Sequence, residues 1–401
     1  MSNILFYSRF APDPSPNSGG IEKVTSVLSK NIIRDKRHMI YYMTPESWQQ
    51  DQADNSFSGI LYLDRHVWMN YNKLLDFIQE NKIDLIVSQY ANDKYNKLFV
   101  RIKEKLGLKL IVAYHFSPGC EMQGIRSFLK HSLDVSFKGR IKRMVKLVLK
   151  PLYLSYKEKS ICSNVNYAFR NSDCFLLLSD RFKDSFIDNY KIKSGKEKIH
   201  AIGNPLSFDK YFPKDQISYK EKIVLVVARH CETEKRISLV FKIWNNIEQS
   251  GFSDWKLVLV GSGEDSQNYK SYVQKLGLKN VEFVGKTNPY PYYNKASIFL
   301  MTSMAEGFGV TLTEAQQMGV VPVAFDSYAS LHDIIKHGYN GIIVENNNIQ
   351  SFTEELAKLM NDDTRREKLA TSAIESCKKF SVESIKGQWL QLFDDVINKK
   401  I

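Results

Sequence analysis

The sequence predicts an α/β protein that contains two doubly wound parallel sheets. Short apolar runs recur every few tens of residues with amphipathic segments between them, which is typical of alternating strands and helices. Residues 222–228 predict a strand, because the six residues after Lys222 form a continuous apolar run, as expected in a parallel sheet that is covered on both faces. At 401 residues the chain is too long for one typical core, so we expect two lobes of about 200 residues each.

The first half of the chain predicts one of the two sheets. A strand at residues 3–8 leads into a loop at residues 9–20, which is rich in proline, serine and glycine. The predicted helix that follows carries an apolar stripe. The stripe consists of Val24, Val27, Leu28 and Ile32, and further strands are predicted at residues 84–88, 109–113 and 174–178.

The second half predicts the other sheet. The helix after residues 222–228 has one apolar face, formed by Leu239, Val240, Ile243, Trp244 and Ile247. A second helix is expected at residues 311–318. Further strands or strand-and-turn segments are expected at residues 255–260, 280–285, 297–303, 320–325 and 338–344.

Proline, glycine and charged residues collect between the two halves, as they do in hinges. We therefore expect a linker at residues 204–220 between lobes at residues 1–203 and 221–380. Residues 381–401 are expected to hold a last helix at 382–397. One face of this helix is apolar, with Ile385, Trp389, Leu392, Phe393 and Val396.

Glu306 and Glu314 flank a glycine turn between the strand at residues 297–303 and the helix that follows it. Gly307 and Gly309 allow a tight turn that brings backbone amides close to a ligand. Carboxylates at such a strand end accept hydrogen bonds from hydroxyls spaced along an elongated ligand, such as a sugar joined to a ribose. Taken alone, the pair is equally consistent with an ordinary strand–loop–helix connection.

Basic residues and a second glycine turn follow two other predicted strands. Arg229 and Lys235 lie where ligands bind in open α/β sheets, and a guanidinium with an ammonium suits a diphosphate. A solvated basic loop is the alternative. Gly261 and Gly263 form a turn that is expected to present amides to an anion. A dinucleotide fingerprint is weak here because position 266 is serine rather than a third glycine.

These segments together resemble the retaining, nucleotide-sugar-dependent glycosyltransferases of family 4, which have the GT-B fold. The resemblance runs almost end to end. It rests on an ordered set of motifs: Gly19-Gly20, Arg229, Lys235, Gly261 with Gly263, Glu306 and Glu314 with Gly307-Phe308-Gly309, and Gly338 with Asn340 and Gly341. It implies two Rossmann-like lobes that face a cleft, with the acceptor on the first lobe, the donor on the second and the last helix crossing back to the first.

The resemblance also implies roles for single residues. Residues that match Arg229 and Lys235 hold the donor diphosphate, together with Gly19, Gly20 and amides at Phe308, Gly309 and Val310. Glu306, Gly307 and Phe308 bind the donor sugar, Glu314 binds the ribose, and Gly261 and Gly263 belong to the nucleotide loop. The stretch between Arg229 and Lys235 departs from many relatives because it contains His230, Cys231 and two acids.

His115 and Glu121 follow the strand at residues 109–113. In relatives a histidine at this position lies near the transferred sugar, so His115 joins Glu306 as an expected catalytic residue, although a lone histidine is more often structural. Glu121 is an expected acceptor contact. No Asp-x-Asp occurs in the sequence, so a metal that bridges the diphosphate is not indicated, and no bound cofactor is expected.

The segment 126–159 is strongly basic and carries apolar residues at three- and four-residue spacing. It predicts an amphipathic helix that docks on an anionic membrane, while a solvated helix packed on its lobe is the alternative. Nucleic acid is not expected, because no nucleic-acid motif accompanies the basic residues. The net charge of +12 agrees with anionic partners, and the five scattered cysteines indicate a reduced, cytoplasmic protein. No apolar run is long enough to span a bilayer, and the first residues do not predict a secretory signal.

The expected function is transfer of a hexose or N-acetylhexosamine, with retention and without a metal, from a nucleotide diphosphate sugar. A UDP-sugar is favoured, and the acceptor is a glycan or lipid-linked glycan in the synthesis of a cell-surface polysaccharide such as lipopolysaccharide or capsule. A nucleotide-sugar epimerase of the same fold and a GDP-mannose-dependent mannosyltransferase are the alternatives. An inactive donor-binding scaffold is disfavoured by Glu306, and a dinucleotide-dependent oxidoreductase by Ser266.

Overall fold

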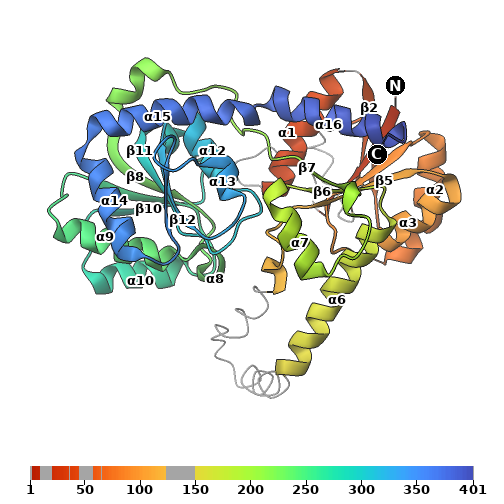
Figure 1. The fold of residues 1–401 in the computed structure, drawn as a ribbon, viewed down its shortest axis with the longest axis horizontal. Helices are drawn as coiled ribbons and strands as arrows, with labels where there is room; N and C mark the ends of the chain where they lie inside the picture. Colours follow the sequence, from red (N-terminus) through yellow and green to blue (C-terminus); the bar gives the residue numbers. More distant parts are fainter. Residues whose placement is uncertain are drawn as a thin grey trace. The chain divides into compact units, whose positions relative to one another are not determined.

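The computed structural model describes residues 2–9, 20–35, 37–44, 57–64, 66–122 and 150–400. The chain divides into two compact units. The first comprises the described residues up to Pro205 together with residues 382–400, and the second comprises Leu206–Ser381. Each unit contains one parallel sheet with helices packed on it (Figure 1).

The sheet of the first unit has seven parallel strands in the order β3-β2-β1-β4-β5-β6-β7. The strands predicted at residues 3–8, 84–88, 109–113 and 174–178 are confirmed to within one residue at each end, whereas three further strands were not predicted. The bounds are β1 Ser2–Tyr7, β2 His38–Thr44, β3 Gly59–Tyr62, β4 Leu85–Ser88, β5 Lys109–Tyr114, β6 Cys174–Leu177 and β7 Ile199–Ala201.

Helices cover this sheet in the doubly wound manner. They are α1 Gly20–Asp35, α2 Tyr71–Glu80, α3 Tyr95–Leu106, α6 Lys150–Asn171, α7 Lys183–Tyr190 and α16 Val382–Ile397. The predicted last helix is confirmed as α16, and it packs beside α1 in the first unit (Figure 1). Its Trp389 and Phe393 rings each lie 6.2 Å from the Phe6 ring of β1. Burial of these aromatic rings holds the end of the chain on the first sheet.

The sheet of the second unit has six parallel strands in the order β10-β9-β8-β11-β12-β13. They are β8 Glu221–Val227, β9 Lys256–Val260, β10 Val281–Gly285, β11 Ala296–Met301, β12 Val321–Asp326 and β13 Ile342–Glu345. The helices are α8 Glu232–Lys235, α9 Ile237–Gln249, α10 Ser266–Leu276, α11 Tyr290–Lys295, α12 Val310–Gln317, α13 Leu331–Ile334, α14 Ile349–Asn361 and α15 Asp363–Cys377. The helix predicted at residues 311–318 is confirmed as α12.

Strand order reverses once in each sheet, between β1 and β4 in the first and between β8 and β11 in the second. At such a reversal the chain leaves the two strands towards opposite faces, which opens a crevice at their carboxyl ends. Ligands of open α/β sheets bind in this crevice. We therefore expect the ligand-binding residues in the segments that follow β1, β4, β8 and β11.

Candidate functional site

In the second unit, the loops after β8 and β11 lie side by side because the two strands pair in parallel. Ile298 of β11 is in register with Val224 of β8. Arg229 follows β8, and Lys235 is the last residue of the short helix α8. The loop after β11 contains Glu306. The side chains of both loops are therefore available at one edge of the sheet.

Lys235 and Glu306 form an ion pair across this edge. The distance from Lys235 Nζ to Glu306 Oε1 is 2.5 Å, and the two side chains are only 19% and 17% exposed. Because little water surrounds the pair, the attraction between the two charges is stronger than on an open surface. The structure thus brings together the two residues that the sequence assigns to a diphosphate and to a sugar.

Arg229 forms a more exposed ion pair with Glu234, with 2.6 Å between Nη2 and Oε2. This hydrogen bond raises the pKa of the Arg229 guanidinium above its ordinary value. Glu232, the other acid of this stretch, has a structural role. It accepts a hydrogen bond from the Ser238 amide at the start of α9 and one from the Tyr269 hydroxyl. The two acids that distinguish this loop are therefore both engaged within the fold.

The turn between Glu306 and α12 ends in a glycine at the N-cap, so no side chain caps the start of this helix. Gly309 has φ = +101°, a conformation that strongly favours glycine, and the residue gives α12 no side-chain cap. A β-carbon at Gly309 would lie 2.9 Å from the Tyr328 hydroxyl. The Phe308 ring is buried against Phe380, with 5.1 Å between centroids. Gly307, Phe308 and Val310 are thus candidates for contact through their backbone groups.

Glu314 lies in the second turn of α12 and is only 3% exposed. Its Oε2 accepts a hydrogen bond of 3.1 Å from the Tyr293 hydroxyl. Burial and the Glu314 carboxylate together raise the pKa of Tyr293 well above its ordinary value, so this phenol remains a hydrogen-bond donor. Tyr293 was not predicted from the sequence, and it fixes the orientation of Glu314.

Gly261 and Gly263 allow the loop after β9 to approach the loop after β8 closely. A β-carbon at Gly261 would lie 1.9 Å from the Ala228 carbonyl oxygen, and one at Gly263 would lie 2.3 Å from the His230 carbonyl oxygen. The Gly261 amide donates to the Gly285 carbonyl, and the Gly263 amide donates to Ser266 Oγ. Both amides thus have partners within the fold, and the assignment of Gly261 and Gly263 to a nucleotide loop stays a prediction.

In the first unit, His115 and Gln89 meet beyond the ends of β5 and β4. His115 Nε2 and Gln89 Oε1 are 2.5 Å apart. Burial lowers the pKa of His115 to about 4, so the imidazole is neutral near neutral pH. A neutral imidazole can donate or accept a hydrogen bond, which suits contact with a sugar hydroxyl. Gln89 is buried and was not predicted from the sequence.

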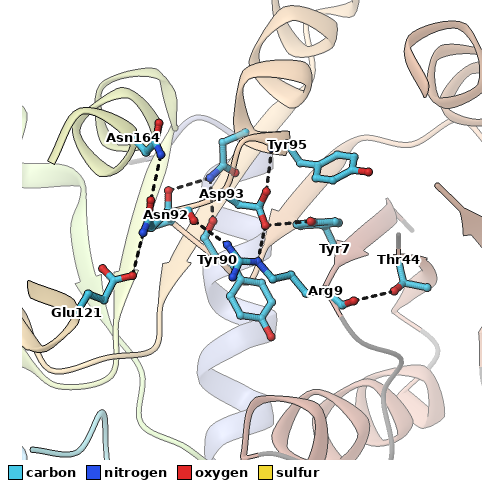
Figure 2. Close-up of polar contacts among 11 residues, drawn as sticks. Tyr7, Arg9, Thr44, Tyr90, Asn92, Asp93, Tyr95, Glu121 and Asn164 are labelled. Carbon is cyan, nitrogen blue, oxygen red and sulfur yellow. Dashed lines mark hydrogen bonds and ion pairs between the residues drawn. The ribbon is translucent and has the colours of Figure 1, made fainter. Parts of the chain in front are cut away.

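Glu121 is held by three donors at the same edge of the first sheet. Asn92 Nδ2 lies 3.1 Å from its Oε1, and the hydroxyls of Tyr190 and Tyr114 lie 3.3 and 3.4 Å from its Oε2. Burial raises the pKa of the Glu121 carboxyl above its ordinary value. Figure 2 shows that Asn92 lies between Glu121 and Asn164, whose side-chain amide donates to Asn92 Oδ1.

Arg9 and Asp93 extend this polar network to the end of β1 (Figure 2). Arg9 Nε lies 2.7 Å from Asp93 Oδ2, and Arg9 Nη2 donates to the Asn92 carbonyl. The Tyr7 hydroxyl also donates to Asp93, while the Arg9 guanidinium lies 4.9 Å from the Tyr90 ring centre. Arg9, Asn92 and Asp93 were not predicted from the sequence. The available signal was that these polar residues come directly after predicted strands.

Two predicted features lie wholly or partly outside the described residues. Gly19 lies outside them, and Gly20 is the first residue of α1. Of the basic segment 126–159, the described part begins at residue 150 in α6. There Leu152 and Tyr156, one turn apart, are 71% and 67% exposed. Within the described part of the chain, no helix is long and apolar enough to cross a membrane, and no group of three potential metal ligands occurs.

The two doubly wound units, with paired charges at the carboxyl ends of β8 and β11, define a protein of the GT-B fold class. Residues 207–376 match the family described as "Glycosyl transferases group 1". The matched residues make up most of the second unit.

Curated relatives of the chain are also glycosyltransferases. An uncharacterised glycosyltransferase of Haemophilus influenzae is 25% identical over 224 residues, which is 55% of this chain and 61% of the relative. A Campylobacter jejuni α-1,4-N-acetyl-D-galactosaminyltransferase, named for an undecaprenol-linked acceptor, is 27% identical over 61% of this chain and 66% of the relative. The matched regions thus span less than two thirds of these two relatives.

Solved structures confirm the fold. The Anabaena protein HepE, crystallised in complex with UDP, superposes with a TM-score of 0.73 at 17% identity and covers 98% of this chain and 100% of HepE. The sequence identity is low, so this likeness establishes the two-domain architecture alone.

Proposed function

We propose that this protein is a retaining, metal-independent glycosyltransferase. It transfers a hexose or N-acetylhexosamine from a nucleotide diphosphate sugar to a glycan or lipid-linked glycan. The observation that carries the proposal is the Lys235–Glu306 pair at the carboxyl ends of β8 and β11. It sets a cation for a diphosphate directly beside a carboxylate for sugar hydroxyls, which are the two chemical parts that such a donor joins.

Donor binding in this proposal exchanges the internal ion pairs for contacts with the ligand. Lys235 and Arg229 turn to the diphosphate, and the backbone at the uncapped start of α12 adds partial positive charge. Glu306 is then free to accept hydrogen bonds from the sugar, and the backbone of Gly307 and Phe308 contacts the same sugar.

The nucleoside lies further along the same edge in this proposal. Glu314, already oriented by Tyr293, accepts hydrogen bonds from the ribose hydroxyls. The loop that contains Gly261 and Gly263 contributes shape rather than the amides of these two residues, because both amides are used within the fold.

The chemical step needs stabilisation of a leaving diphosphate while positive charge develops on the sugar. Arg229 and Lys235 supply that stabilisation through preorganised charge. In a retaining transfer without an enzyme nucleophile, the acceptor hydroxyl attacks on the face that the phosphate leaves. The departing phosphate oxygen takes the hydroxyl proton as the new glycosidic bond forms. Glu306 stabilises the sugar through its hydroxyls and forms no covalent bond with it.

The acceptor is assigned to the first unit. His115, Glu121 and the Arg9–Asn92 network follow three strands at the edge where its sheet reverses. Asp93 offsets the charge of Arg9, so Glu121 is the remaining acidic group of this network. Such a set suits the hydroxyls of a neutral sugar. We also propose that α6 contacts the membrane surface. The exposed Leu152 and Tyr156, which lie beside lysines, support this contact.

A UDP-sugar is the favoured donor, supported by the UDP that is bound to the structurally similar HepE. A lipid-linked acceptor is supported by the Campylobacter relative, whose name specifies a glycan linked to undecaprenol diphosphate. Synthesis of a cell-surface polysaccharide at the inner face of the cytoplasmic membrane is the setting that joins these two proposals.

The test uses Glu306→Gln, with Glu345→Gln as the matched control at the end of β13. Affinity for UDP and GDP is measured by calorimetry, and turnover is measured as nucleotide release from UDP-glucose, UDP-N-acetylhexosamines and GDP-mannose. We expect Glu306→Gln to lower turnover by about a hundredfold or more, because it removes charge stabilisation of the developing cation. Its affinity for the nucleoside diphosphate should not fall by more than about threefold, since Glu306 contacts the sugar and its replacement releases Lys235.

If Glu306→Gln turns over as fast as the wild type and Glu345→Gln, Glu306 is not part of the donor site. Failure of the wild type to bind either nucleoside diphosphate would reject the proposed donor class.

A further inference from the structure

Arg236, the residue after Lys235, has a backbone conformation that side-chain-bearing residues rarely adopt. Its φ and ψ are 50° and 41°, in the left-handed region, and it forms the junction between α8 and α9. A bulky residue is disfavoured there unless the surrounding structure holds it.

The Arg236 guanidinium connects three loops at the carboxyl edge of the second sheet. From its own loop after β8, it donates through Nε to the Thr302 carbonyl at 2.7 Å and through Nη2 to the Ser303 carbonyl at 2.8 Å, both after β11. It also donates to the side-chain oxygens of Asn347 and Asn346, both after β13, at 2.7 and 3.0 Å. A planar fork with several donors is suited to holding such separated acceptors at once.

The loop after β11 returns these contacts. Thr302 Oγ1 lies 2.9 Å from the Lys235 carbonyl oxygen and 3.1 Å from the Arg236 carbonyl oxygen. The Met304 amide donates to the Glu234 carbonyl at 2.8 Å. The backbone on both sides of Lys235 is thus fastened to the backbone that leads to Glu306.

The charge of Arg236 is also arranged differently from that of its two basic neighbours. Arg229 and Lys235 each contact a carboxylate, at 2.6 and 2.5 Å. The four hydrogen bonds of Arg236 with described residues all end on neutral oxygens. Burial lowers the pKa of its guanidinium from its ordinary value. A half-buried cation that contacts no carboxylate among the described residues therefore acts through its fork geometry, its charge, or both.

We propose that Arg236 is a positioning residue whose guanidinium fork holds the loop of Glu306 against the loop of Lys235, and that it thereby sets the affinity of this edge for a diphosphate. The inference rests on the proposed donor site. It assigns to Arg236 no contact with the ligand. Loss of the fork lets the two loops separate, so that Lys235 no longer lies where a diphosphate beside Glu306 requires it.

The test compares Arg236→Gly, which suits the left-handed backbone, and Arg236→Lys, which keeps the charge without the fork. Arg366→Lys is the matched control, because Arg366 also binds a carbonyl oxygen, that of Leu359, but between α14 and α15. Affinities for UDP and UMP are measured by calorimetry on the full chain, or for GDP and GMP if the wild type prefers them. Melting temperatures establish that each variant is folded.

We expect both Arg236 variants to bind UDP about tenfold more weakly than the wild type, with UMP affinity within about twofold, because only the diphosphate needs both loops in register. Arg366→Lys should match the wild type with both nucleotides. UDP affinity retained by Arg236→Lys would overturn the positioning role in favour of charge alone. Equal weakening towards UDP and UMP would show a general structural role. A wild type that binds no nucleoside diphosphate would instead reject the donor site itself.

Discussion

The two ion pairs of the candidate donor site differ in how easily a ligand displaces them. The Arg229–Glu234 pair is about half exposed at both side chains, and such pairs contribute only about 0–1 kcal/mol. A diphosphate can therefore take Arg229 from Glu234 at little cost. Lys235 and Glu306 are far less exposed, so separating them without new partners is expensive. A donor that offers phosphate oxygens to one and hydroxyls to the other supplies those partners together.

The neutral state of His115 leads to a prediction about pH. Its folded pKa is about 4, whereas an unfolded chain has a histidine pKa of about 6.5. Between these values the unfolded chain binds the extra proton, so the free energy of unfolding should fall as pH drops from 6.5 towards 4 and then level off. The loss is at most about 3.4 kcal/mol for this residue. Urea unfolding at pH 7.5 and at pH 5 should show a smaller decrease in the free energy of unfolding for His115→Asn than for the wild type.

Some pH dependence must remain in His115→Asn, because burial also lowers the pKa of His38, His200 and His230. The comparison therefore uses the difference between variant and wild type at each pH. An identical fall in both proteins would show that His115 is not held in the neutral form by the fold.

The sequence identifies Lys235 and Glu306 as candidate ligand-binding residues, but it does not show that they form an ion pair with each other. Glu306 and Lys235 are separated by 71 positions, and only the register of β8 and β11 brings them together. Arg236 gives no sequence signal, because nothing in its neighbours indicates a left-handed arginine. Arg9 and Asp93 likewise require the adjacency of β1 and β4.

At the scale of elements, glycines decide how closely the loops of the second sheet approach one another. The Gly261 amide caps the end of β10 through the Gly285 carbonyl, while the His230 amide donates to the Ser262 carbonyl. The glycine after Asn340 is similarly confined, since a β-carbon at Gly341 would lie 2.8 Å from Pro322. These glycines are therefore required mainly because the backbone packs closely around them.

Gly261→Ala should lower the free energy of unfolding by about 3 kcal/mol or more, because the new β-carbon would overlap the Ala228 carbonyl and φ is +141°. Gly251→Ala is the matched control: its φ is +88°, and nothing lies within 4 Å of the new β-carbon. That control isolates the backbone term, about 1 kcal/mol. Urea unfolding of both variants measures the difference. Equal losses would mean that the loop after β9 relaxes without cost.

The sequence predicted most strands because parallel strands covered on both faces appear as uninterrupted apolar runs. The strands β2, β3 and β7 were missed for a physical reason. β3 and β7 have only four and three residues, and β2 carries two tyrosines and a histidine among its apolar residues. Their pairing with longer neighbours stabilises them, which local sequence does not reveal.

For the whole molecule, the net charge of +12 and the exposed apolar residues of α6 lead to a prediction about the proposed membrane contact. Charge attracts the protein towards anionic headgroups over about 8–10 Å at physiological salt, without fixing which face docks. Leu152 and Tyr156 lie one turn apart and are mostly exposed, so their burial in a headgroup layer adds a local, salt-independent contribution. The two contributions predict different responses to salt and to mutation.

We expect the wild type to sediment with vesicles rich in anionic phospholipid, to bind neutral vesicles weakly, and to lose much of the anionic binding at high salt. The double change Leu152→Ser and Tyr156→Ser should weaken binding by about a hundredfold at low salt, because each side chain contributes roughly 1.5 kcal/mol when buried. Tyr219→Ser, which removes an aromatic ring that is 82% exposed in the second unit, should leave binding unchanged. Equal binding by all three proteins would mean that charge alone attracts the chain, and α6 would then lose its place in the proposed membrane contact.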